Sequence, residues 1–412
     1  MNYKVEFKGE NVEGIIKVPA SKSIANRLLI IQALCKEKFN INNLSDSEDT
    51  VVLQRGLVSE SDIIDIGHAG TSMRFLTAYF ASQPGNKILT GSARMKERPI
   101  GSLVEALQNL GADIEYVEKK GYPPLQIRGK QLNGKRIAID SSISSQFISA
   151  LLMVAPTFKG GLELELEKNV ISSSYIEMTI SLMKLAGVLV KKQDNLLIVP
   201  EATYKMKDFT VEGDWSGVSY WYQIAALAKK PDIAITSLYK ESFQGDARCA
   251  EVFKHVGIET AYNKDGIALS KSTDIPAHFE FDFIENPDIV QTLAVTCVML
   301  GISFKFTGTQ TLRIKETDRI AALQNELGKF GAVLEYSNNG TLSWDGKRNS
   351  LAAIKEPIRI PTYHDHRMAM AFAPIALMGI PVIIENVDVV RKSYPAFWTD
   401  LKAVGFSLTE CE

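Results

Sequence analysis

The chain has 412 residues, of which 45% are hydrophobic and 23% are charged, and its formal net charge is −2. This composition is typical of a soluble globular protein, and the length predicts two domains of about 200 residues each. Without an overall basic excess, the composition argues against nucleic acid or an anionic membrane as the partner. Any surface that binds anions must therefore come from a local cluster of Lys and Arg.

The two ends of the chain and its thiols indicate the cellular setting. The N-terminal residues MNYKVEFK are charged and lack the apolar segment of a secretory signal. The longest apolar run, 368–384, is interrupted by prolines and a glycine and predicts a buried helix followed by a buried strand. The four cysteines show no CxxC or Cys/His spacing, which favours reduced thiols: Cys35, Cys249, Cys297 and Cys411. We therefore expect a cytoplasmic protein.

A helix that ends near a glycine and is followed by a strand recurs along the chain. The glycines are separated by 76, 70, 74 and 74 residues: Gly111, Gly187, Gly257, Gly331 and Gly405. At such a position a glycine takes up a positive φ at little cost. The period near 74 predicts a unit of several strands and two helices, three units per domain, with Gly56 as a shortened first copy. The segment 212–217 is rich in turn formers and is the expected domain junction.

Three motifs in the first half place basic or small residues at turns that lead into helices. In residues 21–27 (SKSIANR), Lys22 lies at a helix N-terminus, where an anion is favoured, and Ser23 and Arg27 share one face. Gly70 allows a ligand to approach the backbone, and the planar guanidinium of Arg98 can bind a carboxylate or phosphate. The alternatives are a capping serine with solvated cations, an ordinary turn and a structural arginine.

Two further helices open with hydroxyl and amide side chains. Ser144, Ser145 and Gln146 begin one apolar helix, and Ser172 and Tyr175 begin another. Such groups can bind a phosphate at a helix start without adding charge. Simple capping is the alternative for each cluster.

Carboxylates accompany the basic residues in the second half. Asp288 precedes an apolar helix at 289–300, as its N-cap or as a catalytic carboxylate. Lys315, Glu316 and Arg319 are expected to start a helix, where Glu316, surrounded by cations, can exchange protons. Residues 364–366 (HDH) look like metal ligands, but no second cluster completes a site, so we expect no metal.

Together these motifs resemble the 5-enolpyruvylshikimate-3-phosphate synthase family, in order and over nearly the whole chain. The matching patterns are SKSxxxR, AGT, RMxxRP, SSQF, KETDR and DHRMAM. The resemblance implies an α/β fold, the two-domain inside-out α/β barrel, in which each domain consists of three βαβαββ repeats. Residues 20–212 would form the first domain, on the shikimate 3-phosphate side, and 1–19 plus 213–412 a discontinuous second domain.

The reaction implied by the resemblance is the transfer of the enolpyruvyl group of phosphoenolpyruvate to the 5-hydroxyl of shikimate 3-phosphate. Asp288 deprotonates this hydroxyl, Glu316, with Lys22 as a second candidate, protonates the methylene carbon, and a tetrahedral adduct then loses phosphate. No metal or organic cofactor takes part. We expect the site in a cleft between the halves that closes on shikimate 3-phosphate, in a monomer that binds neither nucleic acid nor membranes.

The resemblance also implies which residues bind the two substrates. For shikimate 3-phosphate they are Lys22, Ser23, Arg27, Ser144, Ser145, Gln146, Ser172, Tyr175, Asp288, Thr311 and Lys315. For phosphoenolpyruvate they are Lys22, Gly70, Arg98, Gln146, Arg319, Arg367 and Lys392.

Some positions depart from the family pattern. His68 stands where the family usually has Asn, Phe75 where it has Pro, and Thr311 where Asn is frequent. Gly70 matches the glyphosate-sensitive form, so we expect glyphosate to compete with phosphoenolpyruvate.

Two rival functions fit the sequence less well. UDP-N-acetylglucosamine enolpyruvyl transferase shares the fold but usually carries a loop cysteine, and here no cysteine lies between Cys35 and Cys249. A repeat-built binding protein without catalysis has no need for both Asp288 and Glu316.

Overall fold

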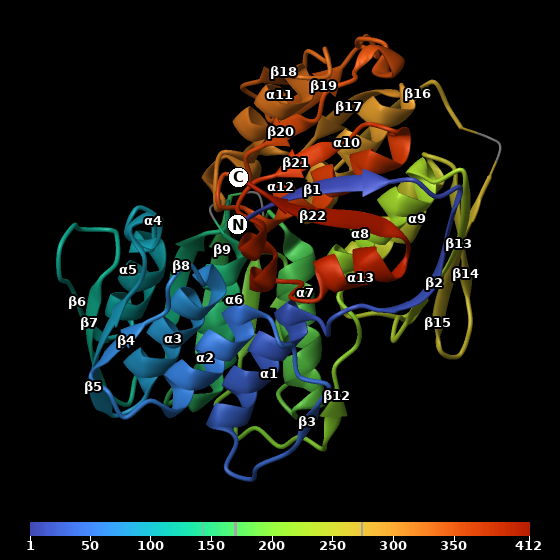
Figure 1. Cartoon of the computed structure of the whole chain (residues 1–412). Helices are drawn as coiled ribbons and strands as arrows, with labels where there is room; N and C mark the ends of the chain where they lie inside the picture. Colours follow the sequence, from blue (N-terminus) through green and yellow to red (C-terminus); the bar gives the residue numbers. More distant parts are fainter. Residues whose placement is uncertain (143, 169–170, 273–274) are drawn as a thin grey trace. The chain divides into compact units, whose positions relative to one another are not determined.

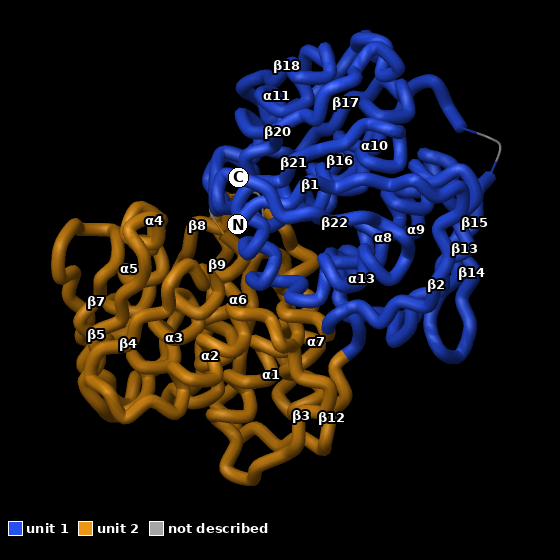
Figure 2. Tube along the Cα trace, viewed as in Figure 1, with its two compact units in different colours: residues 1–19, 212–412 blue, residues 20–211 orange. Residues whose placement is uncertain are grey.

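The computed structural model describes residues 1–142, 144–168, 171–272 and 275–412. Its internal contacts divide the chain into two compact units (Figure 2). Unit 1 comprises Met1–Pro19 and Glu212–Glu412, and unit 2 comprises Ala20–Val211. The chain thus leaves unit 1 after Pro19 and returns to it at Glu212.

Unit 2 contains two four-stranded sheets with helices between their strands (Figure 1). The first has the order β4-β5-β7-β6, with strands β4 (Ile63–Asp65), β5 (Gly85–Thr90), β6 (Asp113–Tyr116) and β7 (Leu125–Gly129). The second has the order β10-β11-β9-β8, with strands β8 (Arg136–Asp140), β9 (Leu162–Glu167), β10 (Lys191–Gln193) and β11 (Leu196–Val199). A short parallel pair joins β3 (Ile41–Asn42) and β12 (Phe209–Thr210), so the third repeat has a reduced sheet.

The helices of unit 2 follow these strands in sequence. They are α1 (Lys22–Leu34), α2 (Glu48–Val58), α3 (Gly70–Ser82), α4 (Ala93–Lys96), α5 (Gly101–Asn109), α6 (Ser145–Val154), η1 (Ala155–Thr157) and α7 (Ser173–Leu185). Nearly every residue of α3 and α6 is buried. A helix that is apolar on all sides belongs in an interior, so these two helices form the centre of unit 2.

Unit 1 contains three four-stranded sheets. The orders are β14-β15-β13-β2, β16-β17-β19-β18 and β20-β21-β1-β22. The strands are β1 (Asn2–Phe7), β2 (Asn11–Lys17), β13 (Lys230–Thr236), β14 (Ile258–Tyr262), β15 (Gly266–Lys271), β16 (His278–Asp282), β17 (Ser303–Thr307), β18 (Glu335–Ser337), β19 (Thr341–Trp344), β20 (Ile358–Ile360), β21 (Val382–Ile384) and β22 (Phe406–Cys411). The N-terminal strands complete two of these sheets, because β1 lies between β21 and β22 and β2 pairs with β13.

The helices of unit 1 include three that are buried on all sides, α8, α10 and α12. The α-helices are α8 (Trp215–Leu227), α9 (Cys249–Lys254), α10 (Val290–Leu300), α11 (Arg319–Gly328), α12 (His366–Phe372) and α13 (Phe397–Ala403). The 3-10 helices are η2 (Gly245–Arg248), η3 (Pro287–Ile289), η4 (Gln310–Ile314), η5 (Leu351–Ala353), η6 (Ala373–Met378) and η7 (Val387–Lys392).

Each four-stranded sheet repeats one plan: a parallel pair followed by two antiparallel strands. These two strands form a hairpin except in the sheet where β1 and β22 come from the two ends of the chain. In the sheet that begins with β4, for example, β4 and β5 are parallel, β5 and β7 are antiparallel, and β6 and β7 form the hairpin. With a helix after each of the first two strands, the repeat is βαβαββ. This is the inside-out α/β barrel plan, in which the sheets surround buried helices.

The regularly spaced glycines share one backbone conformation. All five repeated glycines have positive φ: Gly111 +93°, Gly187 +84°, Gly257 +83°, Gly331 +79° and Gly405 +99°. The predicted helix ends are therefore confirmed. Gly56 is different, because it lies inside α2, where a Cβ would come within 2.7 Å of the Leu76 side chain. Its assignment as a shortened copy was wrong: close packing against α3 calls for the small residue.

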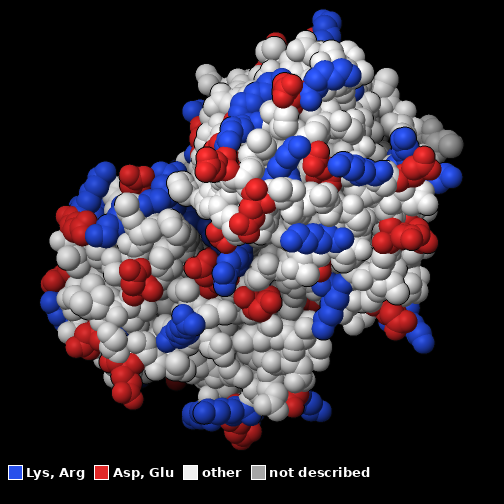
Figure 3. Space-filling view, viewed as in Figure 1, with Lys and Arg blue, Asp and Glu red and all other residues white. Residues whose placement is uncertain are grey.

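The charged residues on the surface and the apolar run at 368–384 are arranged as the sequence predicts. Lys and Arg are interspersed with Asp and Glu on the face shown in Figure 3. Residues 368–384 contribute to α12, η6 and β21, which confirms the predicted helix and strand. Among the residues that the structure describes, no helix is both long and apolar enough to cross a membrane.

Candidate functional site

The centre of the polar cluster in unit 1 is Arg319, the first residue of α11. Its side chain is only 2% exposed, yet each nitrogen contacts a different carboxylate. Nη1 donates to Asp288 at 2.9 Å, Nη2 to Glu316 at 2.9 Å, and Nε to Asp365 at 2.7 Å. Burial alone would lower the pKa of Arg319, but the three carboxylates raise it above its ordinary value. The guanidinium is therefore fully compensated inside the protein.

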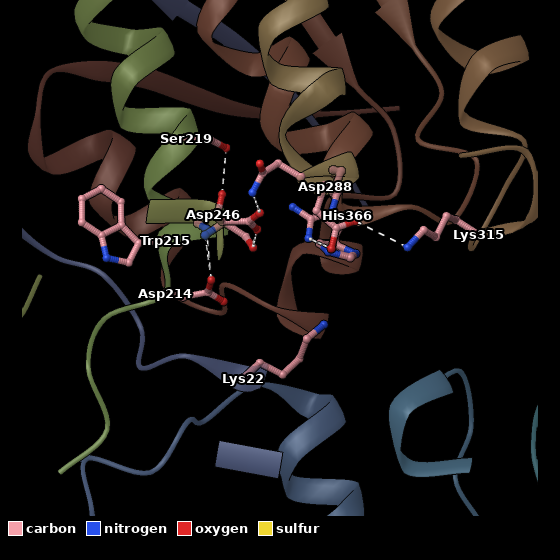
Figure 4. Close-up of polar contacts among 12 residues, drawn as sticks. Lys22, Asp214, Trp215, Ser219, Asp246, Asp288, Lys315 and His366 are labelled. Atoms are coloured by element: carbon pink, nitrogen blue, oxygen red, sulfur yellow. Dashed lines mark hydrogen bonds and ion pairs between the residues drawn. The ribbon is translucent and has the colours of Figure 1, made fainter. Parts of the chain in front are cut away.

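Three more cations surround the same carboxylates. Arg367 Nη2 lies 3.0 Å from Asp288, and Lys392 Nζ lies 2.9 Å from Glu316. Lys315 lies 3.9 Å from Asp288, the ion pair marked by the dashed line to Lys315 in Figure 4. The cluster thus combines groups that can bind anions with groups that can move protons.

The electrostatic environment of Asp288 is dominated by these cations. Burial would raise the pKa of Asp288, but Arg367, Lys315 and Arg319 together hold it well below its usual range. For Lys315 the balance is reversed, and burial lowers its pKa. Without substrate, Asp288 is therefore ionised and only weakly basic.

The local backbone corrects two sequence predictions. Asp288 does not cap the following helix: it lies on η3, α10 begins at Val290, and the Asp288 carboxylate faces the cations. Lys315 and Glu316 do not start a helix either, because α11 begins at Arg319, with the Asp318 side chain capping it by accepting from Ala321 N. The charged side chains that were expected on one helix therefore come from the turn before it.

Two elements complete the cluster in unit 1. Asp365 caps α12 by accepting from Arg367 N at 2.9 Å while its other oxygen accepts from Arg319. Thr311, on η4, has a buried hydroxyl that makes no hydrogen bond to any residue that the structure describes. That hydroxyl can serve a ligand.

The centre of the polar cluster in unit 2 is Arg27, on α1, which is 2% exposed. Its partners are uncharged: Nε donates to Thr179 Oγ1 at 2.7 Å, Nη1 to the Ser23 carbonyl at 2.9 Å, and Nη2 to Ser149 Oγ at 3.1 Å and to the Tyr175 carbonyl at 3.2 Å. Burial lowers the pKa of Arg27 to about 10. This cluster brings Ser23, Arg27 and Tyr175 together from α1 and α7.

The lysine and serines of unit 2 lie at helix starts, as predicted. Lys22 Nζ contacts Asp49 at 3.3 Å. Ser144 caps α6 by accepting from Gln146 N at 3.3 Å, and Gln146 Nε2 donates to Thr71 Oγ1 at 3.2 Å. Ser145 is the first residue of α6, and Ser172 precedes α7 with φ +57°. Ser144 thus binds the backbone N–H of Gln146, and the side-chain amide of Gln146 links α6 to α3.

Gly70 and Arg98 are in close contact. A Cβ at position 70 would lie 2.6 Å from Arg98 Nη1, so the glycine makes room for the guanidinium. His68 Nδ1 lies 2.9 Å from Ser92 Oγ. Phe75 is fully buried, with its ring centroid 5.5 Å from the Arg27 guanidinium carbon. The aromatic residue at this unusual position therefore packs on Arg27.

Several polar residues of the two clusters were not predicted from the sequence. They are Asp49, Ser149, Thr179 and Asp365. Asp365 had a detectable signal, since it opens the DHRMAM motif, but no role in holding Arg319 was predicted for it. The others lie in segments without an unusual pattern. Among the described residues, no group of three or more His, Cys, Asp or Glu is arranged to hold a metal ion.

Comparisons with known proteins agree with one another. The family model described as EPSP synthase (3-phosphoshikimate 1-carboxyvinyltransferase) matches residues 7–57 and 51–401. A 3-phosphoshikimate 1-carboxyvinyltransferase of Bacteroides fragilis is 48% identical over 398 residues, 96% of each chain. That of Vibrio atlanticus is 35% identical over 422 residues, 95% of this chain and 97% of its own. A solved EPSP synthase of Acinetobacter baumannii aligns with a TM-score of 0.77 at 20% identity and covers 100% of both chains.

Proposed function

Because this chain belongs to the EPSP synthase family, we propose that it transfers the enolpyruvyl group of phosphoenolpyruvate to the 5-hydroxyl of shikimate 3-phosphate. The products are 5-enolpyruvylshikimate 3-phosphate and phosphate. The observation that carries the mechanism is the arrangement at Arg319, which holds Asp288 and Glu316 on adjacent nitrogens, each at 2.9 Å. One guanidinium thus holds a candidate base and a candidate acid beside each other.

The roles of the residues follow from this arrangement. Asp288 takes the proton of the 5-hydroxyl as its oxygen attacks C2 of phosphoenolpyruvate, and Glu316 delivers a proton to C3. The tetrahedral adduct then loses a proton from the new methyl group and its phosphate, which restores the double bond. Lys22 remains a second candidate for the proton transfer at C3. The two proposed carboxylate roles require opposite protonation states at the start of the reaction.

The weak basicity of Asp288 without substrate has a chemical explanation in this proposal. Arg367, Lys315 and Arg319 lower the pKa of Asp288. Carboxylate and phosphate groups of the substrates carry negative charge to the same cations, and a nearby negative charge raises the pKa of a carboxyl group. Substrate binding therefore makes Asp288 a better base when a base is needed.

Apart from Lys22, the residues of unit 2 hold substrate in this proposal rather than move protons. Arg27 carries a buried positive charge whose hydrogen-bond partners among the described residues are neutral. Ser144, Ser145 and Ser172 add hydroxyls at helix starts. Hydrogen bonds to a charged group contribute about 1.5–3 kcal/mol each. Shikimate 3-phosphate is the proposed ligand of this cluster, and Gly70, Arg98 and Gln146 are proposed to contact phosphoenolpyruvate.

The test is phosphate release on mixing the chain with phosphoenolpyruvate and a second substrate. We expect release with shikimate 3-phosphate, and ¹H NMR of the mixture then shows the enolpyruvyl ether. Release with UDP-N-acetylglucosamine and none with shikimate 3-phosphate would contradict the proposal in favour of the rival transferase. Absence of release with both would indicate a binding protein.

Three finer expectations belong to the same proposal. Glyphosate competes with phosphoenolpyruvate, as the small residue at Gly70 suggests, and unimpaired turnover at millimolar glyphosate would contradict this. The two compact units are the two domains of the enzyme. The chain acts as a monomer in the cytoplasm, which sedimentation of the purified protein and fractionation of the cell test separately.

A further inference from the structure

Asp246 is a buried carboxylate in unit 1 that the mechanism above does not use. It lies on η2 and is 5% exposed. Ser216 Oγ donates to its Oδ2, and Asn286 Nδ2 donates to its Oδ1 at 3.2 Å. Ser216 belongs to the first turn of α8, and Asn286 stands two residues before Asp288. One side chain thus links three segments that are far apart in the sequence (Figure 4).

The turn that carries Asp246 is itself firmly attached to the start of α8. Gln244, two residues earlier, accepts from Trp215 N at 3.1 Å and donates to the Gly213 carbonyl at 2.8 Å. Its amide nitrogen also donates to Glu212 at 2.9 Å. Gln244 therefore fastens the turn to residues 212–215, and Asp246 extends this attachment to the turn that presents Asp288.

Asp246 is held at an energetic cost. Burial, followed by the negative charge of Asp288, raises the pKa of Asp246 to about 6, although Ser216, Arg367 and Asn286 oppose the shift. A buried charge with mostly neutral partners costs folding free energy. A carboxylate kept under these conditions is therefore a candidate for function rather than for stability.

The importance of this link changes when substrate binds. Without substrate, Arg319 and Arg367 hold Asp288 directly, at 2.9 and 3.0 Å. In the proposed reaction, the same two arginines bind phosphoenolpyruvate. Asp288 then shares their hydrogen-bonding capacity with an anion, and the placement of its turn depends more on the bond between Asn286 and Asp246.

We propose that Asp246 is a positioning residue: through its hydrogen bonds to Asn286 and Ser216, it fixes the turn that directs Asp288 at the 5-hydroxyl of the substrate. This inference rests on the proposed role of Asp288 as the base. Asp246 is not expected to touch either substrate. The hydrogen bonds of Asp246, rather than its charge, position the turn. An uncharged side chain at this position that keeps both hydrogen bonds therefore preserves the function.

The experiment compares Asp246→Ala with Asp246→Asn at saturating substrates, with active chains counted by calorimetric titration of shikimate 3-phosphate. Asp246→Ala lowers kcat about tenfold to a hundredfold, the effect of a misplaced reacting group, and changes KM for shikimate 3-phosphate far less. Asp246→Asn restores kcat to within about threefold of wild type, because the amide oxygen accepts from Asn286 and the amide N–H donates to Ser216. Asp345→Ala, an exposed aspartate paired with Lys347, is the matched control and keeps wild-type kcat.

Two outcomes would overturn the proposal: a wild-type kcat in Asp246→Ala, or an equally low kcat in Asp246→Asn and Asp246→Ala. A double-mutant cycle with Asn286→Ala adds a second criterion. The two losses in kcat are expected to be strongly non-additive, and simple multiplication of them would also contradict the link. If Asp246→Ala does not fold, Asn286→Ala still has to show the lower kcat with little change in KM.

Asp288→Ala in the same assay separates the positioning role of Asp246 from the proposed role of Asp288 as the base. A wild-type chain that does not turn over shikimate 3-phosphate refutes the proposed reaction. A wild-type rate in Asp288→Ala refutes its role as the base. A slow Asp288→Ala together with a fast Asp246→Ala refutes only the positioning role.

Discussion

Arg27 in unit 2 and Arg319 in unit 1 are both buried, but the groups around their guanidinium side chains differ in charge. Arg319 contacts three carboxylates, and they raise its pKa. Among the described residues, Arg27 donates only to hydroxyls and carbonyls, and burial lowers its pKa. A buried cation without a counter-charge is prepared for an external anion, whereas a compensated one must share its carboxylates with the anion that arrives.

The comparison indicates different roles for the two clusters. In the proposed function, an anion that arrives in unit 1 competes with Asp288 and Glu316 and changes their protonation. An anion that arrives in unit 2 is proposed to meet a positive charge and neutral hydrogen-bonding groups, so that it gains binding free energy without moving a proton. Substitutions in unit 1 are therefore expected to act mainly on kcat, and those in unit 2 mainly on KM.

The largest effect is expected for Asp288→Ala and Glu316→Ala. Each removes a proposed proton-transfer group, and kcat falls about 10²–10⁴-fold, as is usual for general acid–base catalysis. Steady-state phosphate release measures this loss. A change confined to KM would contradict the assignment of proton transfer to unit 1.

Arg27→Met tests the cluster in unit 2. The loss of a charge-assisted hydrogen bond, about 1.5–3 kcal/mol, raises KM for shikimate 3-phosphate about tenfold to a hundredfold and leaves kcat within a few fold. Calorimetric titration of shikimate 3-phosphate gives the affinity directly. If binding is unchanged and only kcat falls, the two clusters do not differ in the way described.

Gly70→Ala gives a smaller, selective effect. The added Cβ would lie 2.6 Å from Arg98 Nη1, so the guanidinium has to move. We expect KM for phosphoenolpyruvate to rise about tenfold, roughly one hydrogen bond's worth, with an unchanged affinity for shikimate 3-phosphate. Gly328→Ala is the control, because a Cβ there meets no atom within 4 Å of those described.

The smallest effect concerns stability and pH. Asp246 is the acidic counterpart of Arg27, since its hydrogen-bond donors are neutral, and its pKa is raised to about 6 from about 3.9 in an unfolded chain. Its ionisation therefore costs stability as the pH rises from about 4 to 6, and nothing below about 4, where both states are protonated. Asp246→Asn is expected to gain about 1–3 kcal/mol of unfolding free energy at pH 8 and almost none at pH 4. Urea unfolding at both pH values checks this, and a loss at pH 8 would contradict it.

The family resemblance predicted the fold, and local chemistry predicted most of the helix starts and ends. The positive-φ glycines and the buried helices follow from spacing and composition, and the capping role of Ser144 from its position before an apolar run. The partners of the charged residues could not be predicted in this way. Asp246 meets Asn286 across 40 residues of chain, and Arg319 meets Asp365 across 46, so these contacts exist only in the folded state.

Two sequence predictions failed for related reasons. The N-cap alternative for Asp288 and the placement of Lys315 and Glu316 in a first helical turn were both wrong. In both segments the strong attraction among buried charges, rather than helix propensity, determines where the side chains lie. Sequence patterns describe local preferences, and this cluster is a place where tertiary electrostatics override them.

The most direct test of the contrast between the clusters is the free energy of unfolding of Arg27→Met and Arg319→Met without ligand at pH 7.5. Arg319→Met strands buried Asp365 without its guanidinium and is expected to lose about 3–5 kcal/mol, as when one partner of a buried pair is removed. Arg27→Met strands no charge and is expected to lose less than half as much. Equal losses, or a larger loss in Arg27→Met, would contradict the account.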